Sequence, residues 1–194
     1  GVNVGVNKSV KELKSEFDAV VLCGGSQKPR DISVEGRELE GIHFAMDFLP
    51  QQNKRNEGDT ISDVISITAK DKNVLIIGGG DTGSDCLGTS LRQGAKNVYQ
   101  FELLPEPPRE RSGNNPWPQW PLIFRVDYSH AEYAHRFGED PRVYAVLTKK
   151  LLDDGTGCVS GIQTVEVDWS VPGSDTPFSE IPGTEKVWPC DLVL

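Results

Sequence analysis

The length, composition and charge of the chain exclude several broad classes of protein. Its 194 residues suit one domain, or one domain with part of another, and 37% of them are hydrophobic. The formal net charge of −9 argues against a nucleic-acid partner, because such binders gather positive charge to neutralise phosphates. No apolar run approaches the roughly 20 residues that span a bilayer, and the first residues lack the order of a signal peptide. We therefore predict a cytoplasmic protein with neither nucleic acid nor membrane as a partner.

The cysteines and histidines give no pattern of a metal site or a redox pair. None of the four cysteines lies within four residues of another, so we interpret them as small buried hydrophobic side chains. His130 and His135 are five residues apart, which does not bring both onto one helical face, and His43 is isolated. We interpret all three histidines as ordinary side chains. The absence of an evident acid, base or nucleophile fits a hydride-transfer module, in which a cofactor supplies the chemistry.

The first 50 residues predict two short helices and one strand. Ser9–Glu16 begins with the sequence of a capping box and predicts a helix. The apolar stretch Ala19–Cys23, closed by Gly24 and Gly25, predicts a strand that is buried on both faces. A second short helix is predicted at Ile42–Leu49.

The segment that begins at Lys72 predicts a βαβ unit. Val74–Ile77 is an aliphatic run that leads directly into glycines. A helical stretch follows to Gln93, and Gly94 stands where a helix closes with a left-handed residue. Asn97–Leu103 alternates with period two, which predicts the second strand. This order of strand, glycine turn, helix and strand is complete in about 30 residues.

The remainder of the chain predicts a proline-rich loop, a helix and a β-meander. Six prolines lie within residues 105–121, too many for a regular helix or a central strand. Trp117 and Trp120 lie among them, and we interpret them as packing the loop onto the domain or a partner, with ligand stacking as the alternative. The later predicted elements are a helix at His130–Phe137, meander strands at Val143–Leu151, Val159–Trp169 and Glu185–Trp188, and the start of a buried strand at Asp191–Leu194.

Gly78, Gly80 and Gly83 have the GxGxxG spacing of a dinucleotide site. The first glycine makes the tight turn, the second lets the pyrophosphate approach the backbone, and the third lets helix and strand pack closely. The helix that follows directs its free amide groups at the phosphates. Because these glycines follow an aliphatic strand and open a helix, we predict a nicotinamide dinucleotide bound across the turn. The predicted contacts also include Gly79, Asp81 and Thr82.

Three charged residues bear on the choice between NADH and NADPH. Glu102 lies 24 positions after Gly78, where an acidic side chain would bond a ribose 2′-hydroxyl and repel a 2′-phosphate, which favours NADH. Arg109 and Arg111 follow a few residues later and can instead bind that phosphate. All three can instead be solvated loop charges. We lean to NADH, with NADPH as the alternative that one acidic residue does not exclude.

Several further segments accompany the glycine motif. They are VLIIGGGDTGSDCLGTSLRQG at Val74–Gly94, NPWPQWP at Asn115–Pro121, FGEDPR at Phe137–Arg142, DLVL at Asp191–Leu194 and the earlier Phe17–Asp31. Together they resemble the small (β) subunit of glutamate synthase, and the equivalent C-terminal part of single-chain glutamate synthases. The resemblance covers nearly the whole chain.

The resemblance implies a flavin oxidoreductase of glutamate biosynthesis. In that family, electrons pass from NAD(P)H to FAD and then through iron–sulfur centres to a glutamine-using large subunit. The implied fold is α/β: a Rossmann-like NAD(P)-binding domain, with a parallel sheet and a β-meander, plus part of an FAD-binding domain. Gly24 and Gly25 match a glycine turn near the FAD/NAD(P) junction. The implied division is residues 1–50 for the FAD part, 51–71 for a connector, 72–190 for the NAD(P) domain and 191–194 for the start of the return strand.

The sequence also departs from the family. It has no first GxGxxG for the FAD pyrophosphate, no series of cluster-ligating cysteines and no FAD segment after Leu194. We therefore expect a piece of a larger flavoprotein that is catalytically incomplete alone, with FAD and iron–sulfur clusters held by the full-length protein. Two alternatives stay open. One is a non-catalytic module that docks a partner subunit through its tryptophan loop, and the other is a Rossmann methyltransferase in which Glu102 would bind the ribose of S-adenosylmethionine.

Overall fold

The chain forms two compact units in a computed structural model that describes residues 1–25, 28–173 and 175–194. The first unit comprises Gly1–Arg30 and the second Asp31–Leu194. None of the helices in these described ranges combines the length and the apolar character needed to cross a bilayer.

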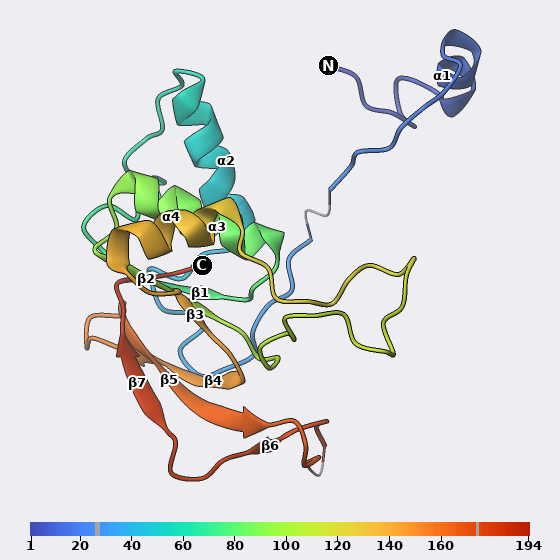
Figure 1. Cartoon of the computed structure of the whole chain (residues 1–194). Helices are drawn as coiled ribbons and strands as arrows, with labels where there is room; N and C mark the ends of the chain where they lie inside the picture. The colour runs from blue at the N-terminus through green and yellow to red at the C-terminus, as the bar shows by residue number, and fades with distance from the viewer. Residues whose placement is uncertain (26–27, 174) are drawn as a thin grey trace. The chain divides into compact units, whose positions relative to one another are not determined.

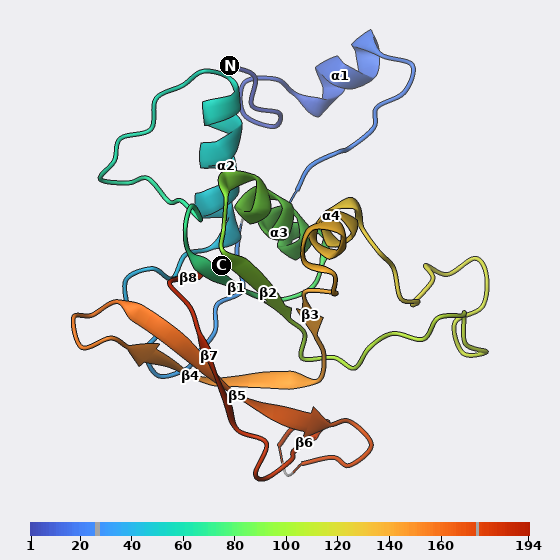
Figure 2. The ribbon, with the colours of Figure 1, turned by 60° about the vertical axis from the view of Figure 1, so that its left-hand side comes forward.

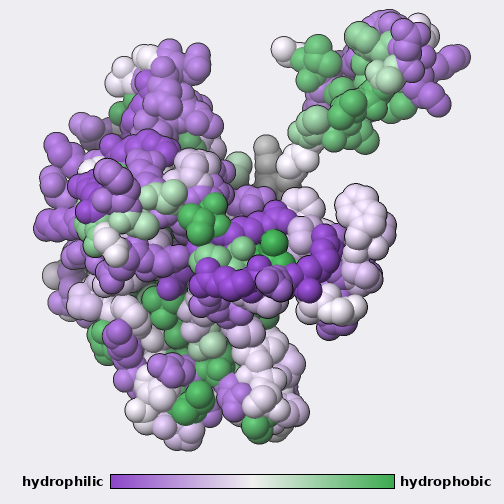
Figure 3. All heavy atoms as spheres, in the orientation of Figure 1, coloured by the Kyte–Doolittle hydropathy of each residue, from purple (hydrophilic) through white to green (hydrophobic). Residues whose placement is uncertain are grey.

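The described part of the first unit contains one helix, α1 (Val10–Glu16), and the predicted capping box begins it. The backbone N–H of Glu12 donates to Ser9 Oγ at 3.2 Å, and the backbone N–H of Ser9 donates to the Glu12 carboxylate at 2.7 Å. These hydrogen bonds from Ser9 lower the pKa of Glu12. Figure 3 shows hydrophobic atoms gathered on one side of this unit.

The predicted strand at Ala19–Cys23 is wrong. The segment has no regular secondary structure, and Val21 and Leu22 are 81% and 91% exposed. A strand buried on both faces must bond its N–H and C=O groups to neighbouring strands. Among the described residues, no strand pairs with this segment, so its apolar side chains stay at the surface.

The second unit is built on a four-stranded parallel sheet, in the order β3-β2-β1-β8. Val74 of β1 lies opposite Val98 of β2 and Leu192 of β8. Helix α3 (Asp81–Gln93) connects β1 to β2 and ends at Gly94 with φ +89°, as the sequence predicts. The α/β architecture is thereby confirmed. The strands are β1 (Asn73–Ile77), β2 (Asn97–Phe101), β3 (Arg142–Val143) and β8 (Leu192–Val193).

Three helices cover one face of the parallel sheet (Figure 1). They are α2 (Ala45–Asn56), α3 and α4 (Tyr128–Phe137). Alternate residues of β1 face them, because successive side chains of a strand point to opposite sides. The core on this face is made of buried apolar side chains that include Val74, Ile76, Leu87, Leu91, Val98, Tyr133 and Leu192.

An antiparallel sheet covers the other face (Figure 2). Its strands are β4 (Val146–Asp153), β5 (Val159–Asp168), β6 (Ser179–Glu180) and β7 (Lys186–Pro189), with both β6 and β7 paired to β5. The core on this face includes Leu75, Phe101, Leu151, Ile162 and Val193. The predicted meander strands are present, and β6 is an element that the sequence pattern did not predict.

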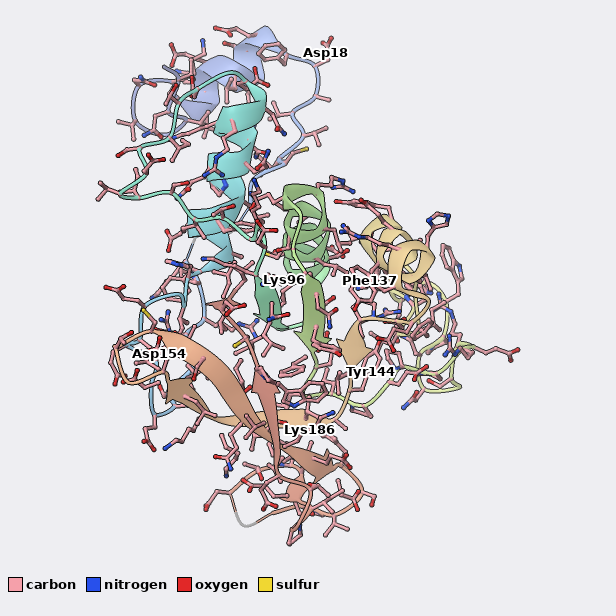
Figure 4. All side chains as sticks on the ribbon, turned by 90° about the vertical axis from the view of Figure 1, so that its left-hand side faces the viewer. Asp18, Lys96, Phe137, Tyr144, Asp154 and Lys186 are labelled. Atoms are coloured by element: carbon pink, nitrogen blue, oxygen red, sulfur yellow. The ribbon has the colours of Figure 1, made fainter. Side chains whose placement is uncertain are left out.

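The predicted strand Val143–Leu151 is divided into β3 and β4. Ala145 lies between them with φ +53°, so the chain turns there from the parallel sheet into the antiparallel sheet. Tyr144, labelled in Figure 4, lies at this junction. A single predicted strand therefore supplies two sheets, which its sequence pattern alone does not reveal.

Residues 31–71 differ in part from the predicted short helix and connector. Helix α2 continues past Pro50 to Asn56, and it buries Phe48 completely. The backbone N–H of Val193 donates to Gly41 O at 2.8 Å, and that of His43 donates to Val193 O at 2.9 Å. The segment before α2 thus packs with the parallel sheet of the second unit.

The cysteines have three kinds of environment: buried, half-buried and exposed. Cys86 and Cys190 are buried, as predicted, and burial raises the pKa of each thiol to about 12. Cys158 is half-buried, and the prediction is wrong for Cys23, which is exposed. The described residues contain no cluster of His, Cys, Asp or Glu that could hold a metal ion.

Candidate functional site

The glycine turn begins where β1 leaves the sheet. Gly78 has φ +115°, a backbone conformation that residues other than glycine rarely adopt. Its N–H donates to Phe101 O at 2.9 Å, so the turn is fastened to the end of β2. This geometry sends the chain sharply back into helix α3.

The head of α3 carries free backbone amides beside open space. Gly80 is the N-cap, and the first helical bond runs from Ser84 N–H to Gly80 O at 3.1 Å. The N–H groups of the three residues between them, 81–83, therefore have no partner within the helix. A Cβ added to Gly80 would meet nothing within 4 Å. Such a helix terminus favours a bound anion.

Gly83 is required by packing rather than by backbone conformation. A Cβ at this position would overlap the carbonyl oxygen of Gly78 and lie 2.8 Å from Gln100 Nε2. Any larger residue would push α3 away from β1 and β2. The third glycine of the motif therefore sets the distance between the helix and the sheet.

Glu102 lies directly over the turn from the end of β2. A Cβ on Gly79 would overlap the Glu102 carboxylate, so any larger residue there would have to displace the Glu102 side chain. The backbone of Glu102 is fixed on both sides, since its N–H donates to Val143 O at 2.8 Å and its carbonyl accepts from Val146 N–H at 3.1 Å. Burial raises the pKa of Glu102, and the nearby Arg142 charge partly opposes that rise.

A cavity of about 370 Å³ opens in front of these groups. Gly79, Gly80 and Asp81 form one wall, and Glu102 forms another. The remaining walls come from the two ends of the proline-rich loop, from α4 and from the β3–β4 junction. Its apolar lining consists of Leu104, Pro105, Pro107, Ile123 and Val126. The cavity thus joins an anion-binding helix terminus to an apolar slot, a combination that suits a nucleotide.

Ser84 adds an unsatisfied polar group to the cavity wall. The residue is 2% exposed, and its Oγ has no hydrogen-bond partner among the described residues. A buried hydroxyl without a partner costs about 1–3 kcal/mol, so such groups in native proteins are commonly satisfied by a ligand or by water. An oxygen-rich ligand at the head of α3 would satisfy this one.

Comparison with known proteins gives relatives along the entire chain, although no family model matches it. The chain is 49% identical over 196 residues to "Glutamate synthase [NADH]" of Schizosaccharomyces pombe, covering 100% of this chain and 9% of that protein. It is 44% identical over 192 residues to "Glutamate synthase [NADPH] small chain" of Bacillus subtilis, covering 98% and 39%.

The chain is a glutamate synthase small-chain-like region. It is homologous to oxidoreductases over its full length, and it spans less than half the length of the curated relatives it matches. A solved structure of FprA, an oxidoreductase of Mycobacterium tuberculosis, superposes with a TM-score of 0.56 at 18% identity, covering 99% of this chain and 52% of that one. At that identity the likeness shows the fold alone, an α/β arrangement shared with an oxidoreductase.

Arg109 and Arg111, the two arginines predicted to bind a 2′-phosphate, do not line the cavity. Arg109 packs over the Phe124 ring at 3.7 Å and pairs with Glu106 at 2.6 Å. Arg111 Nη1 donates to two backbone carbonyls of the loop, at 3.0 and 2.9 Å. Both side chains hold the loop in shape, and neither lines the cavity.

Two other arginines line the cavity instead. Arg142 is tied by its Nε and Nη2 to the Asp140 carboxylate, at 2.8 and 2.6 Å, and its Nη1 donates to Arg125 O at 2.7 Å. Arg125 packs its guanidinium over the Trp120 ring, 4.3 Å from the centroid. Arg142 belongs to the segment that the resemblance singled out, but no spacing rule pointed to a role at the cavity.

The other predicted residues, apart from Asp81, are not among those that line the cavity. Gly24 and Gly25 belong to the first unit, and a Cβ on either would meet nothing within 4 Å. Trp117 and Trp120 are 83% and 72% exposed, so neither is packed onto the domain as one interpretation required. Thr82 lies at the head of α3 among the three free amides.

Sequence reasoning missed the polar pair Gln100 and His130. Both are buried, and His130 lines the cavity. Their signal was present in the alternation of β2, because Gln100 shares the strand face of buried Val98. A polar residue on a face that packs against helices needs a partner, and that requirement points to a buried hydrogen-bond network.

Proposed function

We propose that this region binds NAD(P)H and presents it for hydride transfer to FAD in a glutamate-synthase-type oxidoreductase. The observation that carries the proposal is the glycine turn, with three free amides at the head of α3 beside open space at Gly80. When bound, the nicotinamide would supply a hydride to the flavin, and the residues of this region would hold and orient the dinucleotide.

The residues of the cavity fit a dinucleotide. The amides of Asp81, Thr82 and Gly83 would bind the diphosphate oxygens, with Ser84 Oγ as an additional donor. The Glu102 carboxylate would accept from a ribose hydroxyl. The apolar loop residues around the cavity would cover the adenine ring.

NADH is the preferred cofactor under this proposal. A 2′-phosphate would meet the Glu102 carboxylate, which lies against Gly79. Arg142 forms a salt bridge with Asp140, so its charge would do little to offset the repulsion between Glu102 and a 2′-phosphate. Relatives named for NADH and for NADPH are similar to the chain to nearly the same degree, 49% and 46% identical, and do not decide the choice.

The wider assignment belongs to the same proposal. Residues 72–190 would form the nucleotide-binding domain, residues 1–50 part of an FAD-binding domain, residues 51–71 a connector and residues 191–194 a return strand. FAD and iron–sulfur clusters would be held by the rest of a larger cytoplasmic protein, whose partner is a glutamine-using large subunit or domain.

Gly80→Val tests the proposal directly. The added side chain points into open space, so we expect the fold to survive while the diphosphate is excluded. Wild type should gain about 2.7 kcal/mol of unfolding free energy at 100 times Kd of NADH, and Gly80→Val should gain none. Differential scanning fluorimetry measures this shift, with Gly113→Val as a control at another glycine that has open space around it.

The exposure of Trp117 and Trp120 favours a second candidate, a docking module with a structural glycine turn. That candidate predicts that neither NADH nor NADPH binds wild type at about 1 mM, in a titration calorimetry experiment. The methyltransferase alternative predicts stabilisation by S-adenosylmethionine and not by NADH. Either result would contradict the proposal.

A further inference from the structure

A chain of buried hydrogen bonds connects helix α4 to the glycine turn. Gln100 is 0% and His130 5% exposed. His130 Nε2 lies 2.9 Å from Gln100 Oε1, and Gln100 Nε2 donates to the carbonyl oxygen of Gly78 at 3.1 Å. At the other end, the backbone N–H of Asp127 donates to His130 Nδ1 at 3.3 Å.

The direction of these bonds fixes the protonation of His130. Because Nδ1 accepts from Asp127 N–H, the ring proton of the neutral imidazole is on Nε2, which donates to Gln100 Oε1. The Gln100 amide is thereby oriented with its nitrogen toward Gly78. Every member of the chain is satisfied only when His130 is neutral.

The orientation of the Gly78 carbonyl determines the orientation of the Gly79 N–H. In a trans peptide the C=O of one residue and the N–H of the next point in opposite directions. A carbonyl held toward Gln100 therefore turns the Gly79 N–H away from Gln100, and Gly79 lines the cavity. The orientation of the Gly78–Gly79 peptide therefore determines which way the Gly79 N–H points at the wall of the cavity that would bind the diphosphate.

We propose that Gln100 and His130 are positioning residues that hold the glycine turn in its nucleotide-binding geometry, and that only neutral His130 does so. The inference rests on the proposed function, since the ligand is the dinucleotide bound by the turn. On protonation, Nδ1 would gain a hydrogen that faces the Asp127 N–H, and one bond of the chain would become a repulsion. Nucleotide affinity should therefore fall on acidification.

The charges around His130 agree with a neutral ring near pH 7. Burial and the Arg142 charge on β3 lower its pKa below 6.5, while the carboxylates of Asp140 and Asp127 act in the opposite direction. The weakening is therefore expected only below about pH 6.5. Glu102 also titrates on the acid side, so the experiment must separate the two groups.

The variant His130→Gln separates the effect of His130 titration from that of Glu102 titration. The amide nitrogen of glutamine can keep the donor to Gln100, but it does not titrate, and Glu102 is unchanged. We expect the Kd of wild type for NADH to rise by roughly threefold or more between about pH 7.5 and pH 5.5, and the Kd of His130→Gln to change less. His135→Gln, a change at an exposed histidine of the same helix, should keep the wild-type profile.

Gln100→Leu removes the link itself. At about pH 7.5 it should weaken NADH binding by about tenfold relative to wild type, because the Gly78 carbonyl loses its donor. The difference should narrow near pH 5.5, where binding by wild type is itself weakened. A purely structural role for Gln100 would lower thermal stability and leave Kd unchanged in the folded fraction. The inference is overturned if Gln100→Leu binds NADH like wild type, or if His130→Gln and wild type share one pH profile. Absence of NADH binding by wild type at all pH values would instead refute the proposed function.

Discussion

Two segments of this chain share one sequence pattern and have different structures. Val74–Gly79 and Val20–Gly25 are both short apolar runs that end in glycines. The first contains β1, with β2 on one side and β8 on the other, and its side chains are buried on both faces. The second has no strand partner among the described residues, and its side chains are exposed. An apolar run becomes a buried strand only where neighbouring strands satisfy its backbone.

The largest contrast should be in stability. Leu75→Ala removes a side chain that is 1% exposed between the two sheets, and we expect a loss of about 3 kcal/mol of unfolding free energy. Leu22→Ala removes one that is 91% exposed and should change stability by less than about 0.5 kcal/mol. Urea denaturation measures both. Equal losses would show that the two runs are packed alike.

A smaller contrast is expected at the glycines. Gly83→Ala should cost about 1–3 kcal/mol and weaken NADH binding, because the added Cβ overlaps the Gly78 carbonyl. Gly24→Ala meets no neighbouring atom and should leave both quantities unchanged in this chain. Parallel urea denaturation and NADH titrations test the pair. Loss of NADH binding in Gly24→Ala would place the first unit at the nucleotide site.

The smallest effect concerns Glu102. Its pKa is raised in the folded protein, so the charged carboxylate costs stability. The cost is complete above the folded pKa, shrinks as pH falls below that value and is absent below the unfolded pKa. Glu102→Gln should therefore stabilise the fold at pH 7 by less than about 1 kcal/mol, with no gain near pH 4. The same variant should reduce the preference for NADH over NADPH. A loss of stability at pH 7 would contradict this account of the carboxylate.

The sequence predicted what depends on local pattern. The β1–α3–β2 unit, the capping box of α1 and the left-handed Gly94 follow from residues close together in the chain, and the structure confirms them. The GxGxxG spacing also predicted how the glycines would be used, since Gly78 is left-handed and Gly83 is limited by packing.

What the sequence could not predict depends on contacts between distant segments. Arg109 and Arg111 are close to Glu102 in sequence, but both are exposed and contact groups of the loop itself, not the cavity. Arg142 reaches the cavity from β3, forty residues after Glu102, because β3 pairs with β2. The bond between Gln100 and His130 similarly joins a strand to a later helix.

Amide hydrogen exchange with and without NADH tests the central claim most directly, since both glycine segments are followed in one experiment. The account predicts slower exchange at residues 79–83 when NADH is bound, and no change at Gly24 and Gly25. Binding of NADH without protection at the head of α3 would contradict it.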